Sequence, residues 1–210
     1  MYNRNLRKPN PNKNIYKFIS VKNKTSIMCE SSLEYDTCFL FEYNVNIVSY
    51  QSQPSGFEYP FEGKKRFYTP DFLVEYVDLT KEYFEVKPSV RAVESEFVQK
   101  FNAIKVAVKQ QQTSISLITE RQIHIQPRLD NAKLLYRYAD IQQRNPLQCE
   151  IVSFLRRQRL NKISAKVLAI KLNYSQGDVN SNVLALLSAG YIQADILNNK
   201  FNDEILLWVD

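Results

Sequence analysis

What the chain lacks excludes several classes of protein. It has three cysteines, Cys29, Cys38 and Cys149, without CxxC spacing, and a single histidine, His124, so we expect neither a zinc site nor a disulfide framework. No window approaches the roughly 18 consecutive apolar residues of a membrane span, and the N-terminus has no apolar signal-peptide core. These absences predict a protein of the reducing cytoplasm with no membrane partner.

Acidic residues are missing from two stretches that are rich in lysine and arginine. The chain has 28 Lys and Arg against 22 Asp and Glu, a formal net charge of +6, and residues 1–28 and 151–177 contain no acid. Clustered positive charge can neutralise the phosphates of DNA, although a solvated surface is the alternative. The candidate DNA-binding residues are Arg4, Arg7, Lys8, Arg156, Arg157, Arg159 and Lys162.

Changes of pattern along the chain divide it into three segments. Residues 1–28 are rich in Asn, Lys and Pro and predict a basic N-terminal arm with little structure of its own. Residues 29–144 predict one α/β domain. Residues 145–210 show three short amphipathic stretches and two terminal β runs, the order of a winged helix.

The central segment alternates between helix and strand signals. Residues 30–43 lack Gly and Pro and can bury one broad helical face. Five β-rich runs follow, and an amphipathic helix over 91–110 leads into an apolar strand near 114–119, which makes a strand–helix–strand crossover. Hairpins joined to a crossover predict a mixed sheet flanked by helices. The β-rich runs are NIVSYQ, FEYPF, KRFYT, DFLVEYV and EYFEVK.

The strongest chemical signal is YTPDF at 68–72 followed by YFEVKP at 83–88. Asp71 begins one β run, and Glu85 and Lys87 lie two residues apart on the next, so these two side chains share a face. Hard carboxylate oxygens suit Mg²⁺, which neutralises charge developing on a phosphodiester. Lys87 beside the metal would activate the attacking water or stabilise the transition state. The spacing indicates a PD-(D/E)XK nuclease, against the alternative of solvated ladder residues.

A third carboxylate is expected from the preceding helix. Glu34 is the preferred residue and Glu30, four positions earlier, is the alternative. Gln53 and His124 are expected to be structural, although the Gln53 amide could orient a water or phosphate. The predicted catalytic set is therefore Glu34, Asp71, Glu85 and Lys87, with the three acids as ligands of Mg²⁺ or, in its place, Mn²⁺.

Four segments together resemble the TnsA endonuclease subunits of heteromeric bacterial transposases. CESSLEYDTCFLFEYNVNIVSYQSQP at 29–54 resembles the family's acid-bearing helix and following strand, and YTPDFLVEY its aspartate strand. EYFEVKPS at 82–89 and the helix–strand segment ending in TERQI at 119–123 extend the likeness. The resemblance implies a restriction-endonuclease-like fold, and the segment 145–210 agrees with the family's two-domain plan. Some members carry glutamine where this chain has Glu85.

The resemblance also implies a function and partners. A bacterial protein of this family would nick the 5′ strands at transposon ends during cut-and-paste transposition. An integrase-type, TnsB-like transposase subunit would process the 3′ strands, and an AAA+, TnsC-like ATPase would regulate the assembly. The alternatives are a nuclease-fold assembly factor that only bridges transposon DNA, transposase and regulator, and a winged-helix transcription regulator.

The winged-helix segment leaves two roles open. Its third helix would present polar side chains to the DNA major groove, or the module would dock a protein partner. The polar side chains are Ser175, Gln176, Asn180, Ser181 and Asn182.

Overall fold

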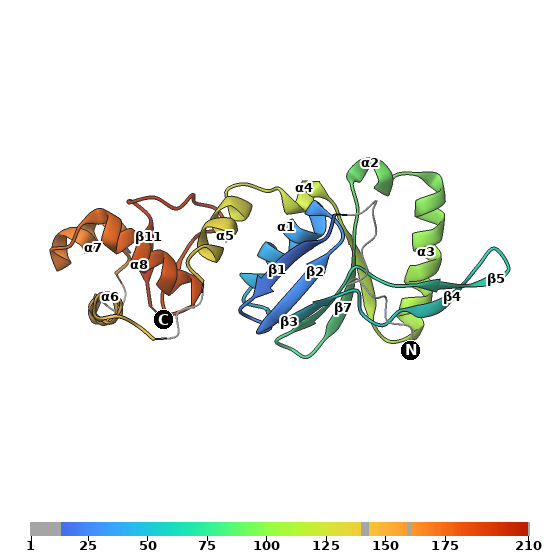
Figure 1. The fold of residues 1–210 in the computed structure, drawn as a ribbon, viewed down its shortest axis with the longest axis horizontal. Coiled ribbons are helices and arrows are strands. Elements are labelled where there is room, and N and C mark those ends of the chain that lie inside the picture. The colour runs from blue at the N-terminus through green and yellow to red at the C-terminus, as the bar shows by residue number, and fades with distance from the viewer. Residues whose placement is uncertain (1–13, 140–142, 159–160, 210) are drawn as a thin grey trace. The chain divides into compact units, whose positions relative to one another are not determined.

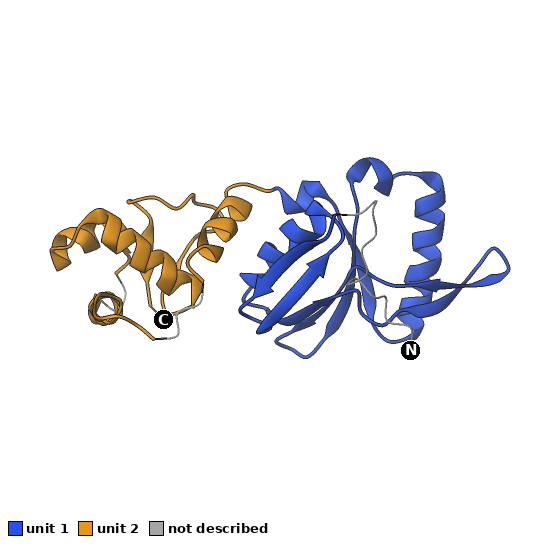
Figure 2. Cartoon of the chain, viewed as in Figure 1, with its two compact units in different colours: residues 1–124 blue, residues 125–210 orange. Residues whose placement is uncertain are grey.

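The computed structural model describes residues 14–139, 143–158 and 161–209 (Figure 1). The chain divides into two compact units, residues 1–124 and residues 125–210 (Figure 2). The sequence predicts a boundary at residue 145, so the second unit is longer at its N-terminal end than the predicted segment. No helix in the described ranges has the length and apolar character needed to cross a membrane.

A four-stranded mixed sheet forms the centre of the first unit. Its strand order is β3-β6-β7-β8, with β7 and β8 parallel and the other pairs antiparallel. Helix α3 (Ser95–Gln110) connects the parallel pair, which confirms the predicted crossover. The predicted mixed sheet flanked by helices is confirmed. The strands are β3 (Ile47–Ser52), β6 (Phe72–Tyr76), β7 (Lys81–Val86) and β8 (Ser114–Ile118).

Neighbouring side chains of β7 contact different helices on the two faces of this sheet. Phe84 packs on Phe41 of α1 (Ser32–Glu42), with ring centroids 5.3 Å apart. Tyr83, its neighbour, packs against the cluster formed around Phe101 of α3. Successive strand residues point to opposite faces, so α1 and α3 cover opposite faces of the sheet. Glu85 therefore shares the α3 face with Tyr83.

Two hairpins complete the first unit. Strands β1 (Tyr16–Ser20) and β2 (Thr25–Cys29) pair antiparallel and pack on α1 through Phe18 and Phe39, whose ring centroids are 5.0 Å apart. The expectation of an unstructured arm over residues 1–28 is therefore wrong for this part, while residues 1–13 lie outside the described chain. Strands β4 (Phe57–Phe61) and β5 (Lys64–Tyr68) form the second hairpin, which extends beyond α3 in Figure 1.

Lys22, one of the basic residues of the predicted arm, stabilises the first unit. It lies in the turn between β1 and β2, and its Nζ donates to the carbonyls of Phe41, Asn44 and Ile47 at 2.7–2.9 Å. The carbonyls at a helix C-terminus lack partners within the helix and attract positive charge. Lys22 thus caps α1 and ties the hairpin to it. Burial lowers the pKa of Lys22 to about 8, an effect opposed by Glu42.

Two short helices, α2 and α4, complete the described part of the first unit. In the described part of the second unit, six elements follow α5. The small sheet of the second unit has the order β10-β11-β9. The three short amphipathic stretches predicted within residues 145–210 correspond to its helices α6, α7 and α8. The bounds are α2 (Ser89–Ala92), α4 (Glu120–Ile123), α5 (Arg128–Tyr136), α6 (Pro146–Gln158), β9 (Ile163–Ser164), α7 (Ala165–Leu172), α8 (Gln176–Ser188), β10 (Gln193–Ala194) and β11 (Leu206–Trp208).

Asn131 explains why α5 belongs to the second unit. This side chain is 2% exposed, and its Nδ2 donates to the carbonyls of Ile196 and Asn199 at 2.7 and 2.8 Å. Its Oδ1 accepts from the Phe201 N–H at 3.0 Å. One buried amide therefore satisfies three main-chain groups of the loop between β10 and β11, a requirement invisible to local sequence patterns.

We predict that Asn131→Leu, a change of similar volume, lowers the free energy of unfolding by on the order of 3 kcal/mol, because three hydrogen bonds from the buried amide to main-chain groups are lost. Urea unfolding checks this, with exposed Asn161→Leu in the same unit as the control. Equal effects of the two substitutions would contradict the role given to Asn131.

Candidate active site

Asp71 stands at the start of β6, where the strand leaves a proline-containing turn. Its Oδ2 accepts a hydrogen bond from the main-chain N–H of Val86 at 2.7 Å, so β6 and β7 share this carboxylate. Its carbonyl accepts from the N–H of Gln53 at 2.8 Å, just beyond β3. Asp71 is thus fixed at the end of three neighbouring strands.

Glu85 is held by two side chains of different charge. The residue is 7% exposed, its Oε1 lies 2.8 Å from Lys87 Nζ, and its Oε2 accepts from the Tyr68 hydroxyl at 2.5 Å. Burial, followed by the neighbouring Glu85 carboxylate, raises the pKa of Tyr68 above its ordinary value, so the phenol stays a proton donor. Sequence reasoning missed Tyr68, although it opens the YTPDF motif.

Lys87 follows the last residue of β7 and remains in the ladder with β8. Its N–H donates to the Ile118 carbonyl at 3.0 Å, which keeps the chain extended and holds Glu85 and Lys87 on one face. Its Nζ also lies 4.8 Å from the ring centroid of Phe97 on α3. A carboxylate and an aromatic face therefore fix the ammonium group between the sheet and α3.

The chain after Lys87 is anchored by a second acid. Ser89 donates to the Glu120 carboxylate from both its N–H, at 2.8 Å, and its hydroxyl. These bonds lower the pKa of Glu120. Thr119 caps α4 in a capping box with Gln122. The TERQI segment thus secures the turn that leaves the site, a role that a motif comparison alone does not reveal.

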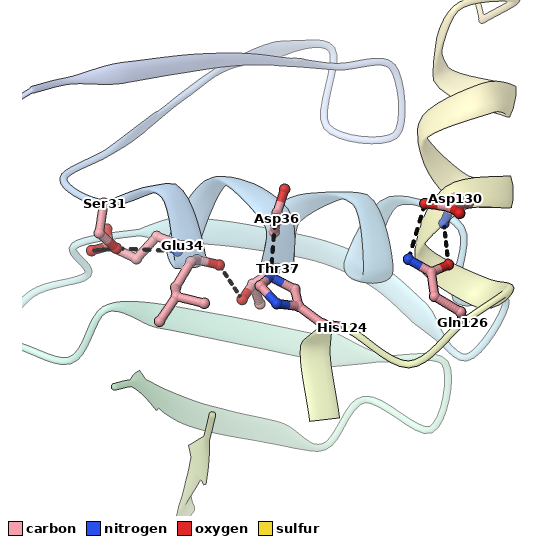
Figure 3. Close-up of polar contacts among 8 residues, drawn as sticks. Ser31, Glu34, Asp36, Thr37, His124, Gln126 and Asp130 are labelled. Carbon is pink, nitrogen blue, oxygen red and sulfur yellow. Dashed lines mark hydrogen bonds and ion pairs between the residues drawn. The ribbon is translucent and has the colours of Figure 1, made fainter. Parts of the chain in front are cut away.

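Glu34 lies in the first turn of α1 and is 5% exposed. Its Oε1 accepts from the Ser31 hydroxyl at 2.8 Å and its Oε2 from the Glu30 N–H at 2.9 Å, and Figure 3 shows it beside Ser31. Ser31 in turn caps the helix by accepting from the Glu34 N–H. Glu34 therefore stabilises the start of the helix. Its negative charge also raises the pKa of Asp71.

Like charges are concentrated around Asp71. Burial, then the carboxylate of Glu85, then that of Glu34, raise the pKa of Asp71 well above its ordinary value. The Val86 N–H and Lys87 oppose this shift and do not offset it. An excess of buried negative charge with partly compensated carboxylates is typical of functional sites.

Oxygen donors of this kind fit Mg²⁺, which prefers carboxylates and carbonyls. Asp71 and Glu85 supply carboxylate oxygens of this type, and binding of a cation to them stays a prediction. Within the described residues, however, no three acidic, histidine or cysteine side chains form a ready metal-binding group. The role of Glu34 as a third ligand therefore stays a prediction.

Gln53 and His124, both expected to be structural, occupy different positions. Gln53 binds the Asp71 carbonyl through its main chain, as a sheet-edge residue would. His124 Nε2 lies 3.0 Å from Asp36 Oδ2, and this contact joins the end of α4 to α1 (Figure 3). His124 thus stays outside the acidic cluster.

The predicted DNA-binding residues are distributed differently. Arg4, Arg7, Lys8 and Arg159 lie outside the described residues. Arg156 and Arg157 are exposed near the end of α6. Lys162 is exposed, with its Nζ 4.1 Å from the centroid of the Trp208 ring. DNA contact by these residues stays a prediction.

The polar residues at the start of α8 are engaged within the second unit. Ser175 caps α8 and also donates to Asp178 at 2.6 Å. Asn180 donates to Asp203 at 2.7 Å, and Asn182 to the Asp178 carbonyl at 2.8 Å. Base contact by these side chains would require them to exchange internal partners.

Residues 44–120 match the family model of the TnsA-like endonuclease N-terminal domain. Over these residues the first unit is similar to TnsA-like endonucleases. The matched segment includes Asp71, Glu85 and Lys87 and begins after Glu34. A domain of this family implies membership of a Tn7-type transposase system. None of the curated proteins searched matches the chain.

We predict that Asp71→Asn stabilises the metal-free TnsA-like domain at neutral pH. The raised pKa means that folding favours protonated Asp71, so this stability is present below the unfolded-state pKa and is lost as pH rises through the folded-state pKa. Asparagine is neutral at every pH, and its oxygen can still accept from the Val86 N–H.

Thermal unfolding in EDTA across a pH series tests this. Each 1 kcal/mol gained moves Tm by roughly 2–4 °C in a chain of this size. The advantage of the variant should shrink as the pH falls toward the unfolded-state pKa of about 4, because below that pKa the wild-type carboxyl is protonated in both states. A variant less stable than wild type at pH 7 would refute the electrostatic crowding.

We also predict that Tyr68→Phe destabilises the metal-free domain by about 1–3 kcal/mol, because the buried Glu85 carboxylate loses a donor. Tyr59→Phe is the matched control: Tyr59 lies on the same hairpin, is 2% exposed, and its hydroxyl makes no hydrogen bond to the described residues. Equal Tm changes in the two variants would show that the Tyr68 hydroxyl contributes nothing specific.

Proposed function

We propose that this protein is a metal-dependent DNA endonuclease that nicks the 5′ strands at transposon ends during cut-and-paste transposition. The observation that carries the proposal is the convergence of Asp71, Glu85 and Lys87, joined by the Val86 N–H and the Glu85–Lys87 ion pair. The family match of residues 44–120 supports a nuclease of a Tn7-type system.

Asp71 and Glu85, with Glu34 as the third acid, would hold Mg²⁺, and Mn²⁺ would substitute for it. Held by these residues, a cation would supply positive charge to the scissile phosphate and would make the attacking water more acidic. The chain itself supplies the acidic residues on fixed strands and excludes much of the solvent around Glu85, which strengthens electrostatic interactions there.

Lys87 supplies the positive charge of the proposed reaction. Its Nζ is held by Glu85 at 2.8 Å and by the Phe97 ring, so little conformational freedom is lost when a phosphate arrives. The ammonium group would stabilise charge on the phosphate oxygens or orient the attacking water. A pair of carboxylates that only binds a metal would not need a lysine held in this position.

The second unit is proposed to be a winged-helix module. The order α6-β9-α7-α8-β10-β11 and the β10-β11-β9 sheet support this assignment. The exposed pair Arg156 and Arg157 is suited to phosphate contact, whereas the internal hydrogen bonds at the start of α8 favour docking over base readout. The proposed partners are transposon-end DNA, an integrase-type TnsB-like transposase subunit and an AAA+ TnsC-like regulator.

Asp71→Ala and Lys87→Ala are predicted to reduce 5′ strand nicking at least about 100-fold, because each removes an electrostatic group from the transition state. The assay combines the protein, its cognate transposase, transposon-end DNA and Mg²⁺, and maps nicks on a sequencing gel. Lys81→Ala, an exposed change on the same strand, should nick at the wild-type rate.

Full nicking by both site variants would reject the site. Full transposition without any 5′ nicks would instead favour the assembly-factor alternative, in which the nuclease fold only bridges DNA and transposase. Thermal unfolding of each variant verifies that lost nicking does not reflect lost folding.

A further inference from the structure

Gln53 occupies a constrained position beside Asp71. It directly follows β3, and its N–H donates to the Asp71 carbonyl at 2.8 Å, which extends the β3–β6 ladder by one residue. Its backbone has φ 47°, in the left-handed region that residues other than glycine rarely adopt. The residue that contacts the metal-site aspartate through its main chain is thus itself strained.

The side-chain oxygen of Gln53 is also buried without a donor. Gln53 Oε1 is a buried side-chain acceptor that has no hydrogen-bond donor among the described residues. A buried polar atom without a hydrogen-bond partner destabilises the folded state. Strain and an unsatisfied oxygen at one residue next to an acidic cluster are poorly explained by sheet-edge pairing, which needs only the main-chain N–H.

The chemistry of this oxygen indicates which groups could bind to it. An amide oxygen is a hard, neutral donor of the type found around Mg²⁺, either as a direct ligand or through a bound water. Asp71 and Glu85 already bring two carboxylates to this end of β6 and β7, so a neutral oxygen would add a ligand without adding negative charge.

We propose that Gln53 supplies a neutral oxygen to the divalent cation held by Asp71, directly or through one water. This inference rests on the proposed metal-dependent nuclease and adds a residue to its metal site. The positive φ and the unsatisfied oxygen are then the structural cost of a site that is prepared for its cation.

The test measures metal binding apart from cleavage. Gln53→Met removes the oxygen at similar side-chain length and keeps the main-chain bond to Asp71. In EDTA this variant should be at least as stable as wild type, because a buried unpaired oxygen is gone. In a Mn²⁺ titration followed by Tm, it should need a roughly 10–100-fold higher metal concentration for the same stabilisation.

Gln51→Met is the matched control, because Gln51 lies on β3 two residues earlier and is exposed. It should titrate like wild type. A wild-type titration by Gln53→Met would overturn the inference while leaving the nuclease proposal standing. Absence of any Mn²⁺ effect on the wild-type protein would overturn the metal site itself, and the Gln53 proposal with it.

Gln53→Glu covers the case in which the methionine variant does not fold. Glutamate keeps an oxygen and adds a charge, so Tm in EDTA should fall while Mn²⁺ binds at least as tightly as to wild type. An unchanged Tm in EDTA together with an unchanged titration would place residue 53 outside the cation's reach and reject the proposal.

Discussion

The placement of two carboxylates at one end of the central strands β6 and β7 is the constraint on which the rest of the site depends. Asp71 and Glu85 repel each other, and Glu34 adds to the repulsion. Each acid is consequently tied down: Asp71 by the Val86 N–H, Glu85 by Tyr68 and Lys87, and Glu34 by Ser31 and the Glu30 N–H. The fold holds negative charge where hydrolysis of a phosphodiester would require a cation.

The surrounding elements serve this arrangement. The parallel β7–β8 pair keeps Lys87 extended, and Glu120 anchors the chain beyond it through Ser89. The β4–β5 hairpin delivers Tyr68 to Glu85. On the other face, Lys22 caps the end of α1 and Ser31 its beginning, so the helix that carries Glu34 is fixed at both ends.

Much of the first unit could be predicted from its sequence because its signals are local. The apolar pattern from residue 30 to 43, the alternation in FEVK and the crossover helix each depend on short-range periodicity. The hairpin over residues 16–29 was missed because Lys22 looks like a solvated cation, whereas its partners are carbonyls some 20 residues away in the sequence. The early start of the second unit was missed for the same reason, since Asn131 bonds to residues 196–201.

The residues of the site also divide into those with a local sequence signal and those without one. Asp71, Glu85 and Lys87 have motif spacing and could be found, whereas Tyr68 and Glu120 act through hydrogen bonds between separate elements. Glu34 is the preferred third carboxylate by its place on the helix, and the bonds of its carboxylate to Ser31 and the Glu30 N–H depend on the local chain before the helix. The helix pattern predicts which residue is available, and tertiary contacts determine what its oxygens bind.

The most direct test of the central claim is a crystal structure of the full chain grown with Mn²⁺, with anomalous scattering collected to locate the metal. The account predicts an anomalous peak within about 2.5 Å of oxygens of both Asp71 and Glu85. Well-ordered Asp71 and Glu85 without a peak, in crystals saturated with Mn²⁺, would contradict it.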